Sequence, residues 1–335
     1  MSVIMLPICE KPILVYDEKL SMSLAVLEGQ GVDIYPWLVC RYGNIKYNQI
    51  NSSFFYFCEE DPWFVEDKLF IKSLFSYDQG MCGADRDNVI DIVSYSIEHG
   101  ECIVGTFDAF YVPAKNEYKK LHRHCNYLIY GVDTDLSLLY LIGQNDTLNL
   151  VKYTLEFNDF WEALRGNGKP RIEFNSFRLN SSFVFESDFL NLQKSLSEFL
   201  GATSQRIQHA LWERSVFGLA ALRKMREYFC EIGIVHEFVD RNIYLKFFDF
   251  QTMTALRCEK IGCYMALPEL IQMSTRLRAL SMRFVELCKQ YNNQKSIGLV
   301  AEMVRLFDEI VALDKSAVEY MLSHIKDVTK AGNLS

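Results

Sequence analysis

Residues 126–146 read NYLIYGVDTDLSLLYLIGQND, and the fold of the first half of the chain depends on this stretch. Two runs rich in aromatic and aliphatic residues, NYLIYGVD and LLYLIGQND, flank the short polar segment TDLS. Strand-forming runs joined by a few polar residues are typical of an antiparallel hairpin. The sequence therefore predicts two paired strands here, with a turn at TDLS.

Further strand and helix patterns surround this hairpin. Strand-like runs are KPILVY (11–16), FFYFC (54–58) and ECIVGTFDAFYVP (101–113). Helical patterns, with acidic residues near their starts and glycine at their ends, cover residues 17–31, 84–100 and 154–166. This mixture predicts an α+β domain built on a mixed or antiparallel sheet with helices beside it.

The second half of the chain has a different character. After GNGKPRIEFNSF (166–177), and from about Glu186 onward, nearly every stretch shows a helical pattern. The last two patterns, at 267–292 and 295–328, are long and amphipathic, which is typical of helices that pack against a core. We therefore expect an α-helical C-terminal domain. The predicted domains are residues 1–168 and 169–335.

Composition limits the classes of partner. The 335 residues are 50% hydrophobic and carry a net charge of -8 at pH 7. Nucleic acids and anionic membranes attract clustered Lys and Arg, so an acidic chain matches neither well. No apolar run reaches the roughly 18 residues that span a bilayer, and the first residues lack the pattern of a signal peptide. We therefore expect a cytoplasmic protein without a nucleic-acid or membrane partner.

The cysteines give no sign of a metal site or a disulfide framework. There are ten of them, and no two form a CxxC pair, so a zinc ribbon is not expected. Thiols stay reduced in the cytoplasm, where most behave as small buried side chains. We therefore expect no metal and no cofactor.

One cysteine lies in a suggestive setting. The stretch DQGMCGAD (78–85) is similar in order to the nucleophile turn of papain-type proteases, Q-G-x-C-G-[AS]-C. Cys82 precedes a helical pattern, and a helix amino terminus favours the thiolate. The reacting cysteine of the protease motif is the second one, however, and that position holds Asp85 here. A carboxylate cannot replace the thiolate, so we interpret the likeness as accidental and keep Cys82 as a candidate thiol.

The densest group of polar side chains lies in the run KKLHRHCNYLIYGVD. On a strand, His122 and His124 would point the same way, and with Cys125 and an acid they could bind a metal. Alternatively, one histidine could be the base of a Cys–His pair, oriented by Asn145 or Asp146 near the next strand. A third interpretation places both histidines at an exposed strand edge. The pattern alone favours this third interpretation.

Several of these motifs together resemble the N-terminal domain of the butirosin biosynthesis protein H family. The shared features are a strand that ends in D-x-[FY]-Y-[IVL]-P, here DAFYVP (108–113), a histidine-containing segment, IYGVD (129–133) and FNDFWEAL (157–164). The stretch VHEFVDRNIYLKFFDFQTMTALRCEKI (235–261) is similar to the helical half of a branch of this family from antibiotic clusters. The resemblance covers most of the chain.

This resemblance implies a papain-like cysteine-peptidase fold for the first domain. It also implies an acyl or peptidyl transferase that acts on carrier-protein-bound thioesters in the biosynthesis of peptide antibiotics. Its partner would be a carrier protein or a nonribosomal peptide synthetase, and the basic run AKNEYKKLHRH (114–124) would suit an acidic carrier. The alternative is a catalytically inactive relative that binds a carrier protein, a synthetase or a pathway intermediate.

The resemblance further implies a set of catalytic residues. The family nucleophile belongs at the start of the helix predicted at 17–29, which contains no cysteine in this chain. Cys82 or Cys9 would then supply the thiol. The resemblance implies that His124 is the base and that Asp146, or its neighbour Asn145, orients it.

Overall fold

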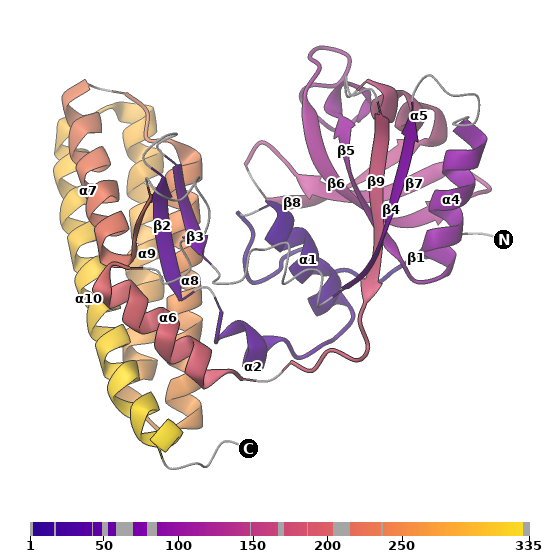
Figure 1. Cartoon of the computed structure of the whole chain (residues 1–335). Helices are drawn as coiled ribbons and strands as arrows, with labels where there is room; N and C mark the ends of the chain where they lie inside the picture. The colour runs from indigo at the N-terminus through magenta and orange to yellow at the C-terminus, as the bar shows by residue number, and fades with distance from the viewer. Residues whose placement is uncertain are drawn as a thin grey trace. The chain divides into compact units, whose positions relative to one another are not determined.

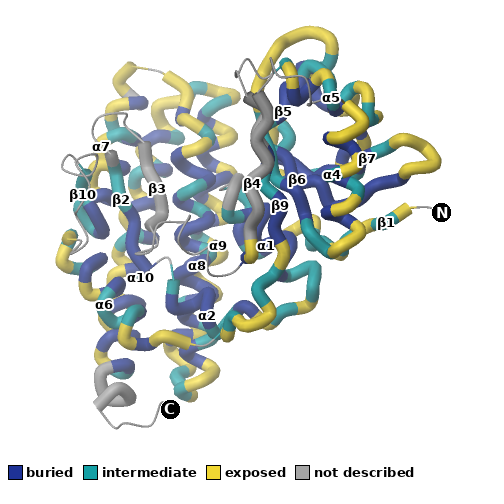
Figure 2. Tube along the Cα trace, turned by 45° about the vertical axis from the view of Figure 1, so that its right-hand side comes forward, coloured by how far each residue is buried: buried dark blue, intermediate teal, exposed yellow. Residues whose placement is uncertain are grey.

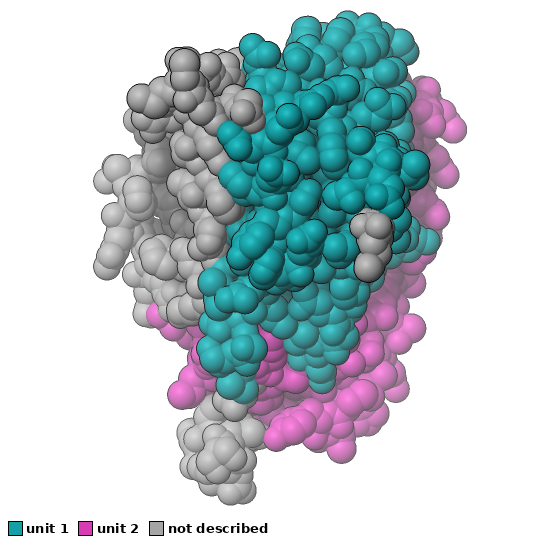
Figure 3. Space-filling model, turned by 90° about the vertical axis from the view of Figure 1, so that its right-hand side faces the viewer, with its two compact units in different colours: residues 1–33, 62–184 teal, residues 34–61, 185–335 magenta. Residues whose placement is uncertain are grey.

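A computed structural model describes residues 3–16, 18–41, 43–48, 53–57, 70–78, 86–147, 149–166, 171–185, 187–203, 215–235 and 237–330. The chain forms two compact units, coloured separately in Figure 3. Unit 1 comprises residues 1–33 and 62–184, and unit 2 comprises residues 34–61 and 185–335. Each unit has its own buried apolar core.

Unit 1 is built on an antiparallel sheet, shown in Figure 1. The strand order is β4-β9-β5-β6-β7-β8, and β1 pairs with β6 beyond the start of β5. All of these pairs are antiparallel. The strands are β1 (Val3–Met5), β4 (Phe70–Asp78), β5 (Cys102–Asp108), β6 (His124–Asp133), β7 (Leu138–Gln144), β8 (Leu150–Glu156) and β9 (Arg171–Leu179).

The predicted hairpin is confirmed as β6 and β7. Asp133 pairs with Leu138, which leaves TDLS as the connecting turn. The Leu136 amide donates a hydrogen bond of 2.9 Å to Asp133 Oδ1, and Ser137 adopts a left-handed φ of 56°. An aspartate that accepts from a nearby backbone amide is a common way to close such a turn.

The helices of unit 1 also follow the predicted patterns. They are α1 (Glu18–Gly29), α4 (Arg86–Glu98) and α5 (Phe157–Arg165), with a short 3-10 helix, η1 (Ala109–Tyr111), after β5. The buried faces of α4 and α5 pack on one face of the sheet, and Figure 2 shows this core in dark blue. Its residues include Val89, Val93, Ile97, Ile103, Phe107, Tyr127, Ile129, Leu141, Phe160 and Leu164. α1 packs against β7.

One predicted strand of unit 1 is absent. The stretch KPILVY (11–16) is irregular backbone that leads into α1. Its polar backbone groups bind side chains instead of a neighbouring strand. The Ile13 amide donates to Glu28 Oε1 at 2.9 Å, and the Val15 carbonyl oxygen accepts from Gln144 Nε2 at 2.8 Å.

The division between the units differs from the predicted boundary at residue 168. β9 pairs with both β4 and β5, so the chain remains in unit 1 through residue 184. Residues 34–61 belong to unit 2, because their strands pair with a partner far along the sequence. The three-stranded sheet of unit 2 has the order β10-β2-β3. Its strands are β2 (Asn44–Asn48), β3 (Ser53–Phe57) and β10 (Ser215–Phe217).

Unit 2 is mainly helical, as predicted, and the chain as a whole is α+β. Its helices are α2 (Tyr35–Leu38), α6 (Phe189–Gly201), α7 (Gly218–Val235), α8 (Arg241–Tyr264), α9 (Pro268–Gln294) and α10 (Ile297–Lys330). The four long helices α7 to α10 lie side by side (Figure 1). Their rings meet in a buried cluster of Phe229, Phe247, Phe284 and Phe307. Among the described helices, none combines the length and apolar character that a bilayer crossing requires.

Candidate functional site

The candidate site lies at one end of the unit 1 sheet, where β5 ends and β6 begins. Asp108, the last residue of β5, stands opposite His124, the first residue of β6. The connecting segment folds back on itself, because the Ala109 amide donates to the Arg123 carbonyl oxygen at 2.8 Å. This return places the residue before Arg123, His122, next to the end of β5.

Asp108 is a fully buried carboxylate held by three donors. Its Oδ1 accepts hydrogen bonds from the backbone amides of Phe110 at 3.0 Å and Arg123 at 3.1 Å. Its Oδ2 lies 2.5 Å from Nδ1 of His122. The position follows from local sequence, since an aspartate at the amino end of a short helix caps the amide two residues later. Three donors satisfy the buried charge and fix its orientation.

The imidazole of His122 is exposed to solvent, and its Nδ1 atom contacts the buried carboxylate of Asp108. The side chain is 60% exposed, whereas the Asp108 side chain is 0% exposed. Since an ionised carboxylate only accepts hydrogen bonds, Nδ1 is the donor, and in the neutral ring the lone pair is then on Nε2. The ring also stacks on Phe110, with centroids 4.3 Å apart and planes inclined by 15°. The ring is therefore oriented by one hydrogen bond and one aromatic contact.

This pairing can perform general acid–base chemistry. A carboxylate on Nδ1 fixes the tautomer of the imidazole and stabilises the imidazolium that forms when Nε2 takes a proton. Asp108 and His122 thus have the relation of the acid and the base in a catalytic triad. We refer to this pair as the Asp108–His122 dyad.

The segment between the two members of the dyad is fixed by its own contacts. Arg123 Nη1 donates to Glu117 Oε1 at 2.8 Å, and the ammonium of Lys115 donates to the carbonyl oxygen of Gln144. Burial raises the pKa of Glu117, but the hydrogen bond from Arg123 and the charges of Arg123 and Lys115 outweigh it, so the net pKa is lowered. The amide of Lys119 donates to the Phe110 carbonyl oxygen at 2.9 Å. The segment that connects Asp108 to His122 is therefore held in position by these hydrogen bonds.

The two polar residues predicted from the resemblance lie at this end of the sheet but do not meet. His124 is exposed, and within the described part of the chain its ring makes no hydrogen bond. Asp146 lies in the turn after β7, where its Oδ2 accepts from the side-chain amide of Asn116. The hydrogen bond to Glu117 raises the pKa of Arg123, and the charge of Asp146 makes a smaller contribution in the same direction. The oriented imidazole is therefore that of His122, two residues before the predicted base.

Of the cysteines that the structure describes, neither Cys9 nor Cys125 forms a hydrogen bond to the dyad. Cys82 lies outside the described residues. The Cys9 amide donates to the Ala25 carbonyl oxygen at 2.8 Å, so this cysteine lies near the carboxyl end of α1, where the helix dipole disfavours a thiolate. Burial raises the pKa of the Cys9 thiol, and the neighbouring Glu28 raises it further. Cys125 is half-buried on β6 and packs against the apolar core.

The amino end of α1, in contrast, lies at the same end of the sheet as the dyad. Gln144, the last residue of β7, donates to the carbonyl oxygen of Val15, three residues before α1 begins. Because β6 and β7 are antiparallel, the end of β7 adjoins the start of β6. The start of α1, where the resemblance implies a nucleophile, therefore lies at this end of the sheet, but Ser21, a hydroxyl in the first turn of the helix, is fully buried.

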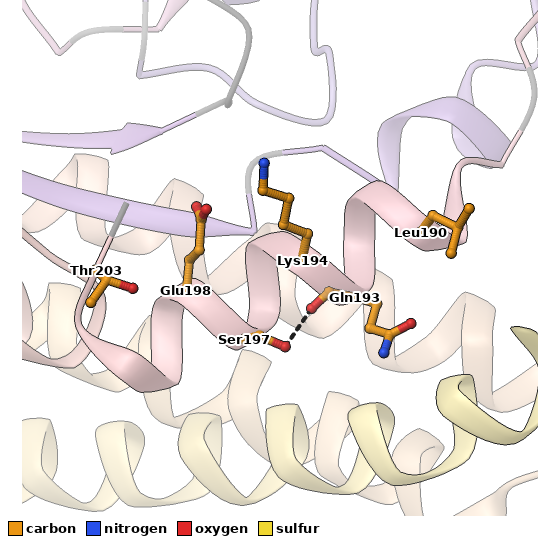
Figure 4. Close-up of a pocket in the computed structure, with 6 residues that line it drawn as sticks. All are labelled: Leu190, Gln193, Lys194, Ser197, Glu198 and Thr203. Carbon is orange, nitrogen blue, oxygen red and sulfur yellow. Dashed lines mark hydrogen bonds between the residues drawn. The ribbon is translucent and has the colours of Figure 1, made fainter. Parts of the chain in front are cut away.

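A separate hollow of about 350 Å³ lies along α6 in unit 2 (Figure 4). It is lined by Leu190, Gln193, Lys194, Ser197, Glu198 and Thr203. Figure 4 shows Lys194 and Glu198 extending to one side of the helix, while Ser197 and Gln193 extend to the other. None of these lining residues is a histidine or a cysteine. Among the described residues, no group of three His, Cys, Asp or Glu side chains could hold a metal ion.

Gly166 offers a structural test of the dyad. A Cβ placed on Gly166, just after α5, would lie 2.9 Å from Asp108 Oδ2 and 3.1 Å from a ring carbon of Tyr111. The carboxylate cannot move aside without losing hydrogen bonds, so Gly166→Ala should cost about 1–3 kcal/mol of unfolding free energy. Gly298→Ala is the control, because its Cβ would meet only Ser296 Oγ at 3.7 Å. Equal urea unfolding midpoints for the two variants would contradict this packing.

Comparison with known proteins provides no family for this chain. No protein-family model matches it, and no curated protein matches it significantly.

Proposed function

We propose that unit 1 transfers an acyl group from a carrier-protein thioester to a nucleophilic acceptor, with His122 as the general base. The observation that carries this proposal is the 2.5 Å contact between a buried carboxylate and a solvent-facing imidazole. Attack on a thioester by an amine or a hydroxyl requires removal of a proton from the attacking group. An imidazole oriented by a carboxylate is suited to that step.

The transfer can be written with every proton accounted for. The acceptor's N–H or O–H gives its proton to His122 Nε2 as its nitrogen or oxygen attacks the thioester carbonyl carbon. The carbon–sulfur bond then breaks, and the departing thiolate takes the proton back from the imidazolium. The products are an acylated acceptor and a free carrier thiol. Asp108 remains ionised throughout and stabilises the imidazolium.

We further infer that unit 1 is related in fold to the papain-like peptidases. In that fold a helix amino terminus adjoins the strand end that bears the catalytic base. The contact between Gln144 and Val15, which brings the start of α1 to the start of β6, supports this inference. Since the helix start has no cysteine, we propose direct attack by the acceptor rather than a covalent acyl-enzyme.

The charge around the dyad supports a carrier protein as the donor. The chain is acidic overall, yet the segment that bears His122 contains Lys119, Lys120 and Arg123, whose side chains reach solvent. Carrier proteins are usually acidic, and complementary charge favours a productive encounter. We therefore propose that the segment at 114–124 docks a carrier protein in the biosynthesis of a peptide natural product.

The proposal is tested by loading a carrier protein with an acyl-phosphopantetheine and adding the full chain. We expect release of the free thiol, followed with a thiol-reactive dye, and transfer of acyl mass to an added amine or alcohol. Release should require both the chain and the acceptor. A rate equal to that of buffer, with every acceptor offered, would contradict acyl transfer.

The alternative function is binding without catalysis. The absence of a cysteine at the start of α1, where the resemblance places the nucleophile, is the observation that favours it. A non-catalytic relative would bind the loaded carrier through the same basic segment and release no thiol. Titration of the loaded carrier into the chain, with binding measured by calorimetry, distinguishes this case from a chain that neither binds nor reacts.

A further inference from the structure

A group of polar side chains is buried between α8 and α10 in unit 2. Asp314, on α10, is 0% exposed, and Gln251 and Thr254, on α8, are each 1% exposed. Gln251 Nε2 donates to Asp314 Oδ2 at 3.3 Å. A carboxylate in an apolar interior is costly unless several donors satisfy it, and this long hydrogen bond is weak support.

In the pair of Asp314 and Gln251, two oxygen atoms lack a hydrogen-bond partner among the residues that the structure describes. Within the described part of the chain, neither Asp314 Oδ1 nor Gln251 Oε1 has a hydrogen-bond partner, and both atoms are inaccessible to water. An ionised carboxylate and an amide oxygen are both acceptors, so each lacks a hydrogen. A carboxylic acid and a primary amide, in contrast, complement each other through one O–H and one N–H donor. One proton on Asp314 would supply the missing donor.

The surroundings of Asp314 favour that proton. Burial raises the pKa of Asp314 to about 6, against opposing effects of the Gln251 hydrogen bond, the charge of Arg257 and the Thr254 hydroxyl. All three opposing groups belong to α8, and α6, α7 and α9 add no further group among the described residues. The Thr254 hydroxyl gives only partial support, since it also lies 3.3 Å from the Phe250 carbonyl oxygen. The charge of Asp314 in turn raises the pKa of Cys258.

Arg257 connects this pair to a distant part of the chain. The guanidinium is 1% exposed, and it donates from Nε to the Val39 carbonyl oxygen at 2.8 Å and from Nη2 to the Arg41 carbonyl oxygen at 2.7 Å. These two bonds hold α2 and the turn after it against α8. An ionised Asp314 would compete for the same guanidinium, because a charged acceptor binds arginine more strongly than a carbonyl does.

We propose that Asp314 and Gln251 share one proton in folded unit 2, and that loss of this proton weakens the hold of Arg257 on residues 35–41. The stability of the helical unit, and the attachment of residues 35–41 to it, would then depend on pH through this pair. The proposal concerns unit 2 alone and does not depend on acyl transfer by unit 1.

The direction of the pH effect follows from the pKa shift. Unfolding returns Asp314 from a pKa of about 6 to its ordinary value of 3.8, so the folded state binds the proton more tightly. The stabilisation is complete below pH 3.8 and is lost as the pH rises through 6. A shift of about two units corresponds to about 100-fold in the unfolding equilibrium constant, of which about tenfold falls between pH 5 and pH 7.5.

The first test compares urea unfolding of the full chain and of Asp314→Asn at pH 5 and pH 7.5. Asparagine keeps the shape of aspartate and can donate to Gln251 Oε1 at any pH. We expect the unfolding equilibrium constant of the wild-type chain, divided by that of the variant, to rise about tenfold from pH 5 to pH 7.5. A ratio that stays constant, or that moves in favour of the wild-type chain, would overturn the proposal. The control is Asp308→Asn. Asp308 is an exposed carboxylate of α10 bound to Arg226, so the same ratio of unfolding equilibrium constants should not change with pH for this variant.

The second test needs no variant. Amide hydrogen exchange of residues 35–41 in the wild-type chain, corrected for the intrinsic effect of pH, should be faster at pH 7.5 than at pH 5. Equal corrected exchange at the two pH values would overturn the proposal even if Asp314→Asn failed to fold.

Discussion

Replacing His122 by alanine is expected to lower the rate of acyl transfer by about 10²- to 10⁴-fold, the usual contribution of a general base. Because the side chain is 60% exposed, its removal leaves no cavity, and the variant should fold. Asp108 would keep its two backbone donors. The loss should therefore appear in the rate of thiol release, measured with loaded carrier at saturation, and not in the binding of the carrier.

The matched control for this substitution is His124→Ala. His124 is of the same residue type, two positions along the chain, exposed and without a hydrogen bond to any described residue. We expect its removal to change the rate by less than about threefold, in line with other surface substitutions away from a site. Asp108→Asn is the second variant, and a loss similar to that of His122→Ala is expected because the amide cannot stabilise the imidazolium. Equal rates for His122→Ala and His124→Ala would rule out the dyad.

The sequence predicts β5, the hairpin of β6 and β7, and the three helices of unit 1, because their signals are local. The strands β1, β4, β8 and β9 are not among the predicted elements. Each strand of the hairpin is a run of aliphatic and aromatic residues, and α4 shows its apolar face in every turn. The helical character of unit 2 is equally local, since α9 and α10 are long amphipathic patterns. These elements require no knowledge of distant contacts.

The dyad is less accessible to sequence reasoning because it depends on a return of the chain. Two histidines two residues apart point the same way only if both lie on the strand, and β6 begins at His124. His122 precedes the strand and turns toward Asp108, fourteen residues earlier. The motif DAFYVP does contain this aspartate, and an aspartate that can cap the turn after a strand is the signal that could have identified it. The choice between the histidines required the register of β5 and β6.

The division into units was also beyond local patterns. Residues 34–61 contain ordinary strand and helix signals, and nothing in them indicates a partner. Their assignment depends on the pairing of Lys46 with Phe217 and on the bonds from Arg257 to Val39 and Arg41. These contacts join residues about 170 to 220 positions apart, and the spacing of residues within either segment does not indicate them.

Replacing Arg257 by leucine is expected to lower the unfolding free energy of unit 2 by about 3–5 kcal/mol, the range for breaking a buried charged network. The substitution would remove the hydrogen bonds that Arg257 donates to the carbonyl oxygens of Val39, which is buried, and of Arg41, which is half-buried. Arg257→Lys should be intermediate, because one ammonium cannot reproduce the two-pronged donor geometry of a guanidinium. Arg276→Leu, which removes an exposed arginine bound to Glu309, is the control and should cost less than about 1 kcal/mol. Urea unfolding gives all three values, and an Arg257→Leu cost as small as the control would contradict the anchor.

The same substitution should change the response of unit 2 to pH. The charge of Arg257 lowers the pKa of Asp314, so its removal should raise that pKa and move the loss of stability to higher pH. Arg257→Leu and Asp314→Asn should consequently be non-additive, with a coupling of about 0.5–3 kcal/mol at pH 7.5 that shrinks at pH 5, where Asp314 is largely neutral. A double variant whose cost equals the sum of the single costs at both pH values would show that the anchor and the proton site act independently. Coupling only at the higher pH would link them through the charge of Asp314.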